Sequence, residues 1–388
     1  MQGISLCGFF NMGDVSRGSL NGYNHSSRDL LFNDLSSLFS TCQVTYIEPC
    51  SEQGDESDVY FIGLGEQNFC LKIFKYKQND EGMVINSDEV YATSLNEVYT
   101  GELLKLLGVD TANATLLSGD LKTQVFHILQ KSGLTDCSSI GDFLEQRPVL
   151  WMDRVYVGGL ECLVRQDGLS QGQLDEKKLR KVVRAYLVSR LLATGDGLGE
   201  KYSKGGDSCL MGFFNQNSGN VLVDRDGNIV LLDQKLGVGE GDSCNLSHGD
   251  DLSCSKEIRA KLVLWWEDII HELSKPDING SSGDFQLNDT LQSAISSIFN
   301  YHENIDVPVQ DDNYRNYQIQ VIKAMQDVLS EFKQINYSEF KQYLHASGIS
   351  VDLKNHILSI YKMLNPSILD MKFLQMSLTS MSCGCLCR

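Results

Sequence analysis

The chain has 388 residues, of which 42% are hydrophobic and 22% charged, and its formal net charge at pH 7 is -18. This length allows one large domain with an appendage, or two to three domains, and the composition is that of a chain with a buried core. The acidic balance argues against extended contact with nucleic acid, so any site for a polyanion has to be local. We see neither an apolar run of membrane-spanning length nor a signal peptide, and therefore expect a soluble intracellular protein.

The amino-terminal part predicts a leader followed by strands. Residues 1–40 are rich in Gly, Ser and Asn, which is typical of a flexible leader. The segments QVTYIEP, DVYFIGL and NFCLKIFKY between residues 43 and 76 have the apolar and β-branched character of strands. We expect three consecutive antiparallel strands, with the polar segment CSEQGDES joining the first two.

Helices and further strands follow. Residues 87–108 begin with Ser and Asp, carry Leu at helical spacing and end at Gly108, which predicts a helix. Residues 114–133, ATLLSGDLKTQVFHILQKSG, are interpreted as two further strands. A long helix is predicted between about 175 and 195, with its buried side formed by Leu179, Val182, Val183, Tyr186, Leu187 and Leu191.

The segment SGNVLVDRDGNIVLLD, residues 218–233, predicts a β-hairpin. Two short apolar runs flank an Asp-Gly pair, which favours a tight turn. A hairpin brings its two flanks to the same edge, so Asn220 and Asp233 are expected to lie together there. An amide oxygen and a carboxylate are suitable ligands for a Mg2+ ion that carries a phosphate chain. The alternative is an ordinary hairpin in which both residues serve the turns.

The remaining chain is predominantly helical, with Trp265 and Trp266 expected as core anchors. Together these patterns predict an α+β fold in four parts: a leader (1–40), a β-rich lobe (41–135), a helical lobe (136–300) and a C-terminal helical module (311–388).

The order of strands, helix, strands, long helix and metal-type hairpin resembles the bilobal protein-kinase-like fold over roughly residues 41–245. The lysine in FCLKIF, Lys72, is similar to the kinase lysine that contacts the α and β phosphates, and Glu97 in LNEVYTGELLKLLGV to its partner on the following helix. The block LVSRLLATGD…GNVLVDRDGNIVLLD resembles the catalytic block of phosphatidylinositol-kinase-like and related atypical kinases.

This resemblance implies a role for each matching residue. Asp196 would orient the attacking hydroxyl, while Asn220 and Asp233 would hold Mg2+, or Mn2+ as the alternative ion, on ATP. In place of a Gly-rich loop, Gly54 and Ser57, with Ser51, would offer donors to phosphate, although three nearby acids oppose this. The adenine-binding backbone would lie near Leu129 to Lys131.

The resemblance is remote, and the catalytic loop departs from it. The family places its catalytic Asp about five residues before the metal-binding Asn, where this chain has Asn215. Asp196 is preferred because it directly ends the long helix, with an insertion after it, and Asp207 is a further candidate. Without Asp196 in the site, a nucleotide-binding pseudokinase becomes the better interpretation.

The predicted long helix begins with a cluster of basic residues, although the chain as a whole is acidic. It comprises Lys177, Lys178, Arg180, Lys181 and Arg184. One interpretation is a solvated face paired with nearby acids. The other is a site for an inositol polyphosphate, a phosphoinositide headgroup or a phosphorylated substrate.

The leading hypothesis is an atypical ATP- and Mg2+-dependent kinase acting on a protein, lipid or inositol phosphate hydroxyl. It is similar to divergent kinases among bacterial effectors, which implies a place in host cytoplasm or at a host membrane, with the C-terminal module as a peripheral membrane or partner contact and no nucleic acid partner. The alternative is a nucleotide-binding pseudokinase scaffold.

Overall fold

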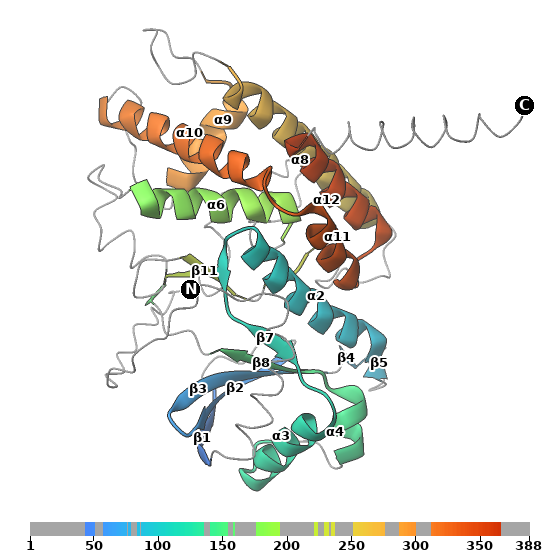
Figure 1. The fold of residues 1–388 in the computed structure, drawn as a ribbon. Helices are drawn as coiled ribbons and strands as arrows, with labels where there is room; N and C mark the ends of the chain where they lie inside the picture. The colour runs from blue at the N-terminus through green and yellow to red at the C-terminus, as the bar shows by residue number, and fades with distance from the viewer. Residues whose placement is uncertain are drawn as a thin grey trace, which may run out of the picture. The chain divides into compact units, whose positions relative to one another are not determined.

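A computed structural model describes residues 43–50, 57–75, 77–78, 84–85, 87–135, 140–153, 158–159, 176–194, 221–223, 229–232, 234–236, 251–275, 287–299 and 312–365. The chain divides into two compact units (Figure 1). The first comprises the described residues of Met1–Val90 and Ala114–Arg154, and the second those of Tyr91–Asn113 and Val155–Arg388. The predicted leader lies outside the described residues.

The first unit contains a five-stranded sheet with the order β1-β2-β3-β8-β7. Its strands are β1 (Val44–Pro49), β2 (Ser57–Leu64), β3 (Gln67–Phe74), β7 (Ala114–Leu116) and β8 (Val149–Asp153), and all neighbouring pairs are antiparallel. The three predicted strands β1 to β3 are thus confirmed. A small pair, β4 (Lys77–Gln78) and β5 (Val84–Ile85), follows β3.

Alternation along the strands gives the sheet two different faces. Helices α3 (Gly119–Lys131) and α4 (Ile140–Gln146) cover one face, where Leu71, Ile73 and Trp151 join a buried cluster with Val125 and Phe126 of α3 (Figure 1). Because side chains alternate along a strand, the residues between these positions belong to the other face.

The structure corrects the interpretation of residues 114–133. Only Ala114–Leu116 forms a strand, while Gly119–Lys131 forms helix α3. Leu121, Val125 and Leu129 are buried at intervals of four, which is the helical period, although the run QVFHIL also has the composition of a strand. The second strand is β8, which lies between β3 and β7, so Leu129 to Lys131 are not on a strand that could supply an adenine-binding backbone.

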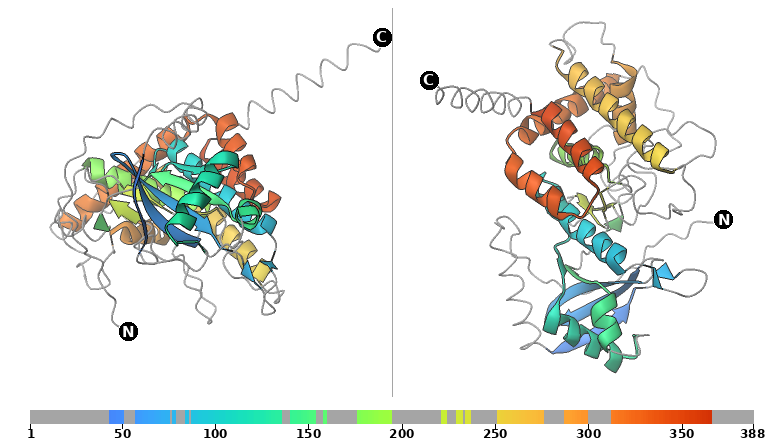
Figure 2. Two further views of the ribbon diagram at one scale, coloured as in Figure 1. Left: turned by 90° about the horizontal axis from the view of Figure 1, so that it is seen from below. Right: turned by 90° about the vertical axis from the view of Figure 1, so that its right-hand side faces the viewer.

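The second unit is built mainly of helices. They are α2 (Ser87–Leu106, from Tyr91 onward), α6 (Glu176–Leu192), α8 (Asp251–Leu273), α9 (Asp289–Phe299), α10 (Asp312–Phe332), α11 (Tyr337–Ala346) and α12 (Val351–Leu364). Figure 2 shows the helices that surround α6 from two further directions. A small sheet with the order β6-β11-β10-β9 completes the unit, formed by β6 (Asp110–Thr111), β9 (Gly158–Gly159), β10 (Val221–Val223) and β11 (Ile229–Leu231).

One hydrophobic core runs through these helices, from α2 to α12. Trp266 and Tyr361 are fully buried in it, and Trp265 is 8% exposed, so the prediction that both tryptophans are core anchors is confirmed. The guanidinium of Arg190 lies over the rings of Tyr186 and Trp265, at 4.6 and 4.8 Å from their centroids. A cation on aromatic faces can be buried at lower cost than one in a purely aliphatic core.

The predicted domain boundaries differ from the observed ones. Strand β8 follows residue 135 but belongs to the first unit, whereas α10, α11 and α12 share the core of α6 and α8. The described part of the predicted C-terminal module is therefore continuous with the helical lobe. The α+β class is confirmed, and the order of three strands, a helix and further strands of the same sheet agrees with the order that the kinase resemblance implies.

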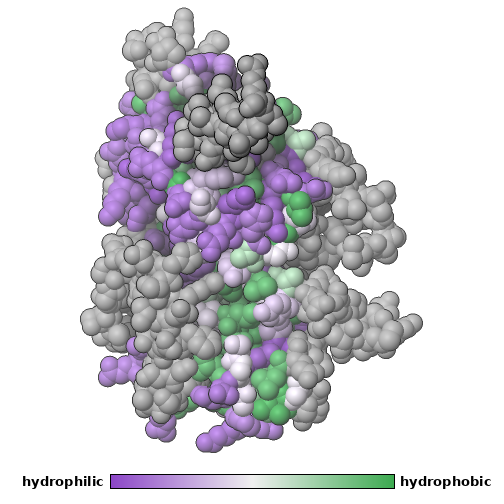
Figure 3. All heavy atoms as spheres, turned by 45° about the vertical axis from the view of Figure 1, so that its right-hand side comes forward, coloured by the Kyte–Doolittle hydropathy of each residue, from purple (hydrophilic) through white to green (hydrophobic). Residues whose placement is uncertain are grey.

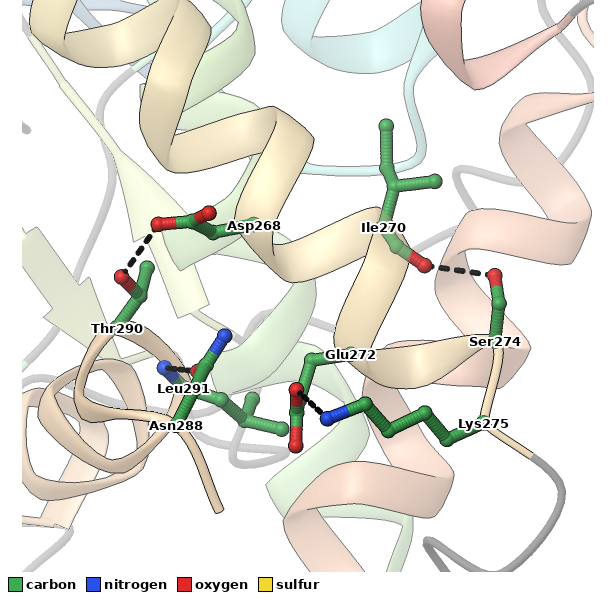
Figure 4. Close-up of polar contacts among 8 residues, drawn as sticks. All are labelled: Asp268, Ile270, Glu272, Ser274, Lys275, Asn288, Thr290 and Leu291. Atoms are coloured by element: carbon green, nitrogen blue, oxygen red, sulfur yellow. Dashed lines mark hydrogen bonds and ion pairs between the residues drawn. The ribbon is translucent and has the colours of Figure 1, made fainter.

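Short polar contacts fix the junction of α8 with α9 (Figure 4). The side-chain oxygen of Asn288 accepts a hydrogen bond from the backbone N–H of Leu291 at 2.8 Å, which satisfies a donor in the first turn of α9. The hydroxyl of Thr290 donates to Asp268 of α8 at 2.8 Å. Helix α9 therefore begins where a local cap and a contact to α8 coincide.

On the face drawn in Figure 3, hydrophilic residues cover much of the described surface, and hydrophobic residues form smaller groups between them. Among the residues that the structure describes, the exposed large hydrophobic ones are Tyr91, Leu264 and Val351. Within the described residues, no helix combines the length and the apolar character needed to cross a membrane.

Candidate functional site

Lys72 occupies the centre of the five-stranded sheet. It lies on β3, opposite Val59 of β2 and Leu150 of β8. Its side chain is only 6% exposed, and its Nζ atom lies 5.4 Å from the ring centroid of Phe74. A buried ammonium group is rare unless it is paired. Lys72 thus differs from the strand lysine that extends into solvent, and its position on the third strand is the predicted one.

Glu97 is also buried, with 5% of its surface exposed. It lies on α2, in the part of that helix that belongs to the second unit. Helix α2 forms where it was predicted, and it ends in a turn at Gly108, which has a φ of 75° that glycine adopts readily. A buried carboxylate on a helix is unusual, and this sets Glu97 apart from an ordinary surface residue.

The predicted hairpin is present. Strands β10 and β11 are antiparallel, and the pairs are Val221 with Leu231, Leu222 with Val230, and Val223 with Ile229. The described register ends one residue from Asn220 and two residues from Asp233, and both of these residues lie outside the described part of the chain. On its outer edges the hairpin pairs with β9 and, in parallel, with β6.

The segment after the hairpin pairs with the end of α6. Leu236 forms an isolated antiparallel bridge with Thr194, and both residues are buried. Between α6 and this bridge, Ala193 has a φ of 51°, a left-handed conformation that is uncommon for a residue with a side chain. The two candidates for the catalytic residue, Asp196 and Asp207, follow Thr194 in the chain but lie outside the described residues, as does Asn215 at the position where the family places its catalytic Asp.

The predicted phosphate loop is described only at its end. Gly54 and Ser51 lie outside the described residues, whereas Ser57 is the first residue of β2, is paired with Phe74 and is 5% exposed. Ser57 is therefore part of the sheet and not of the loop. Its role as a phosphate donor stays a prediction.

The basic cluster of α6 is partly neutralised within the protein. Both oxygens of Glu331 on α10 are used, one by Arg180 and the other by Arg184. Arg184 also donates to the carbonyl oxygen of Leu107 at 3.5 Å, at the end of α2. The interpretation as a face paired with acids thus holds for the two arginines, and Glu331 is a partner that the sequence did not indicate.

The three lysines of the cluster differ from one another in exposure. Lys177 is exposed, and Lys178 and Lys181 are half-buried. At the start of the same helix, Glu176 pairs with Lys323 of α10 at 2.9 Å. A polyanion that binds all five cations would have to displace Glu331.

Asn96 is a polar residue of this region that sequence reasoning missed. Its Nδ2 atom donates to the carbonyl oxygen of Leu236 at 3.0 Å, and its Oδ1 atom accepts from the N–H of the same residue at 2.9 Å. The two residues are 140 positions apart. Its place directly before Glu97 is the one signal in the sequence that could have drawn attention to it.

No cluster of His, Cys, Asp and Glu that could hold a metal ion occurs among the described residues. The predicted ligands Asn220 and Asp233 are not among them. Their amide and carboxylate oxygens are of the type that Mg2+ prefers.

Comparisons of the sequence with known proteins assign the chain to no family. No protein-family model matches the chain, and no curated protein matches its sequence. Among solved structures, the chain is similar to a Helicobacter pylori proinflammatory kinase, CtkA, with 11% identity and a TM-score of 0.35, over 84% of this chain and 92% of that one. It is also similar to the MAP kinase LmaMPK10 from Leishmania major, with 11% identity and a TM-score of 0.30, over 88% of this chain and all of that one. Such low scores carry no argument about activity, so function has to be inferred from the chain's own residues.

Proposed function

We propose that the chain is an atypical kinase that uses ATP and Mg2+ to phosphorylate a hydroxyl group. The observation that carries this proposal is the bridge between Thr194 and Leu236 beside the β10–β11 hairpin. Asp196 follows Thr194 by two residues, and Asp233 precedes Leu236 by three. Two residues of chain span at most about 7 Å and three at most about 11 Å, so the bridge limits how far apart the two acids can lie, which supports their assignment to one site.

The register of the hairpin supports a position for Asn220 close to Asp233. Continuing the observed pairs by one step matches position 220 with position 232, next to Asp233. Amide and carboxylate oxygens at one hairpin edge suit Mg2+, which supplies neutralisation of the phosphate charge when it is bound. Lys72 and Glu97 are each buried, which is unusual for charged side chains, and this supports a functional role for each of them.

The reaction that these residues support is an in-line displacement. The acceptor oxygen attacks the γ-phosphorus, the bond between that phosphorus and the bridging β–γ oxygen breaks, and ADP leaves. Asp196 accepts the proton of the acceptor hydroxyl and orients that hydroxyl for attack. Lys72 balances charge on the α and β phosphates.

Transfer of label from radiolabelled ATP tests this function, with protein, lipid and inositol phosphate acceptors offered separately. We expect incorporation by the unmodified chain, and a loss of about 10²-fold or more in Asp233→Ala and Asp196→Ala. Asp207→Ala is the matched control and should retain activity. Loss in Asp207→Ala with retention in Asp196→Ala would reassign the catalytic residue.

Binding of nucleotide is measured in parallel. Binding without transfer to any acceptor would favour the pseudokinase scaffold. Absence of nucleotide binding by the folded chain would refute both functions.

A second element of the proposal concerns control by a polyanion at the amino-terminal end of α6. The proposed contacts are Lys177, Lys178 and Lys181, while Arg180 and Arg184 are engaged by Glu331. Clustered lysines neutralise phosphate groups as point charges, which suits an inositol polyphosphate or a phosphoinositide headgroup. The effector role, and contact of the C-terminal helices with a host membrane, remain proposals by analogy.

A further inference from the structure

One side chain satisfies both backbone polar groups of Leu236. The planar amide of Asn96 offers a donor and an acceptor side by side, as the edge of a β-strand does, and Leu236 pairs with both at 3.0 and 2.9 Å. Thr194 bridges the same residue. Leu236 is therefore held by a residue of α2 as well as by Thr194, two residues after the end of α6.

The amide of Asn96 is itself oriented. Thr100, one turn further along α2 and fully buried, donates from its hydroxyl to the Asn96 carbonyl oxygen at 2.7 Å and lies 3.0 Å from Oδ1. A hydroxyl that contacts both acceptors limits rotation of the amide. The orientation of the amide that pairs with Leu236 is thus limited by a contact within α2.

Helix α2 is anchored at its other end as well. Leu103, Leu104 and Leu107 are buried in the core of the second unit. At Gly108, the guanidinium of Arg184 occupies the space that a side chain would need. The part of α2 that carries Glu97 is therefore fixed between a packed end and the contact of Asn96 with Leu236.

We propose that Asn96 is a positioning residue that locks the segment after Asp233 to the helix that carries Glu97. This inference rests on the proposed kinase function, because it assigns Asp233 to the metal. Asn96 touches neither nucleotide nor metal in this proposal. It acts through Leu236, three residues from Asp233, and so sets where the carboxylate of Asp233 is held.

If Asn96 positions Asp233 in this way, its removal should weaken the affinity for Mg2+. A residue that orients a metal ligand typically changes metal affinity or activity by about 10- to 100-fold when it is removed. Asn96→Ala removes both hydrogen bonds to Leu236, and Asn96→Asp keeps the acceptor but places a carboxylate against the Leu236 carbonyl oxygen. We expect both variants to need more Mg2+ than the unmodified chain, and Thr100→Val to show a smaller effect in the same direction.

The experiment measures phosphoryl transfer by the full chain against Mg2+ concentration at saturating ATP. In Asn96→Ala the Mg2+ concentration for half-maximal rate should rise about tenfold, and high Mg2+ should restore the maximal rate. General damage to the fold would lower the rate at every Mg2+ concentration and would not be rescued. Asn355→Ala, an exposed asparagine on α12, is the matched control.

A second measurement does not depend on activity. Exchange of the Leu236 amide hydrogen should be slow in the unmodified chain and in Asn355→Ala, and faster in Asn96→Ala. An unchanged Mg2+ dependence in an active Asn96→Ala would overturn the positioning role while leaving the kinase function intact. An unmodified chain that binds no ATP with Mg2+ would instead overturn the proposed function, and the positioning role with it.

Discussion

The contact of Glu331 with two arginines allows a quantitative prediction about stability. Glu331 joins α10 to α6, and Arg184 extends the contact to the end of α2. The side chain of Arg184 is 18% exposed, that of Arg180 40% and that of Glu331 35%. Since solvent screens the more exposed pair, most of the stabilisation should come from Arg184.

The expected magnitudes follow from these exposures. A hydrogen bond between charged groups contributes about 1.5–3 kcal/mol when it is shielded, and an exposed ion pair about 0.2–1 kcal/mol. With Glu331 only partly buried, Glu331→Gln should lower the free energy of unfolding of the second unit by about 2 kcal/mol. Glu267→Gln, an exposed glutamate on α8, should change it by less than about 0.5 kcal/mol.

Urea unfolding followed by tryptophan fluorescence measures this change. Trp265 and Trp266 lie in the core of the second unit, and a Trp151→Phe background removes the signal of the first unit. Double-mutant cycles then pair Glu331→Gln with Arg184→Met and, separately, with Arg180→Met. A coupling energy that is no larger for Arg184 than for Arg180, or one below about 0.5 kcal/mol for Arg184, would refute the reasoning.

Three further predictions concern other sites. Gly108 has a φ of 75°, and a side chain there would meet the guanidinium of Arg184. Gly108→Ala should therefore lower the free energy of unfolding by about 1–2 kcal/mol. An unchanged melting temperature would contradict the close approach. Burial, together with the positive charge of Arg259, lowers the pKa of His356 to about 4. Its neutral form therefore stabilises the fold above about pH 6.5, and this contribution, about 1–2 kcal/mol after allowance for partial exposure, is lost as the pH falls towards 4. His356→Gln should flatten the pH dependence of stability in that window, and an equally steep curve would argue against this assignment. Finally, we consider the triple alanine variant of Lys177, Lys178 and Lys181. It should bind inositol hexakisphosphate about tenfold or more weakly than the unmodified chain, as measured by calorimetry. A change below twofold would refute the proposed polyanion site.

Local patterns in the sequence were sufficient for many elements. The helix predicted to end at Gly108, the long helix of Glu176–Leu192 and the β10–β11 hairpin all appear where periodicity and turn residues predict them. These signals act between neighbouring residues, through side-chain spacing and turn geometry, so the chain needs no tertiary contact to display them.

The same signals were not sufficient where helix and strand compete. Residues 119–131 have the apolar and aromatic content of a strand, yet they form α3 because Leu121, Val125 and Leu129 are buried together against the sheet. The strand that takes the expected place, β8, is defined by its pairing with β3 and β7. Such choices depend on which surfaces become buried.

For the candidate site, the sequence indicated which residues to consider, whereas only the tertiary structure shows which residues they contact. Lys72 and Glu97 were proposed from their order along the chain, whereas their burial is visible only in the structure. Asn96 meets Leu236 across 140 residues, and Arg184 meets Glu331 across 147. Contacts at such separations arise only when the helices pack, because nothing in the local sequence of either partner specifies the other.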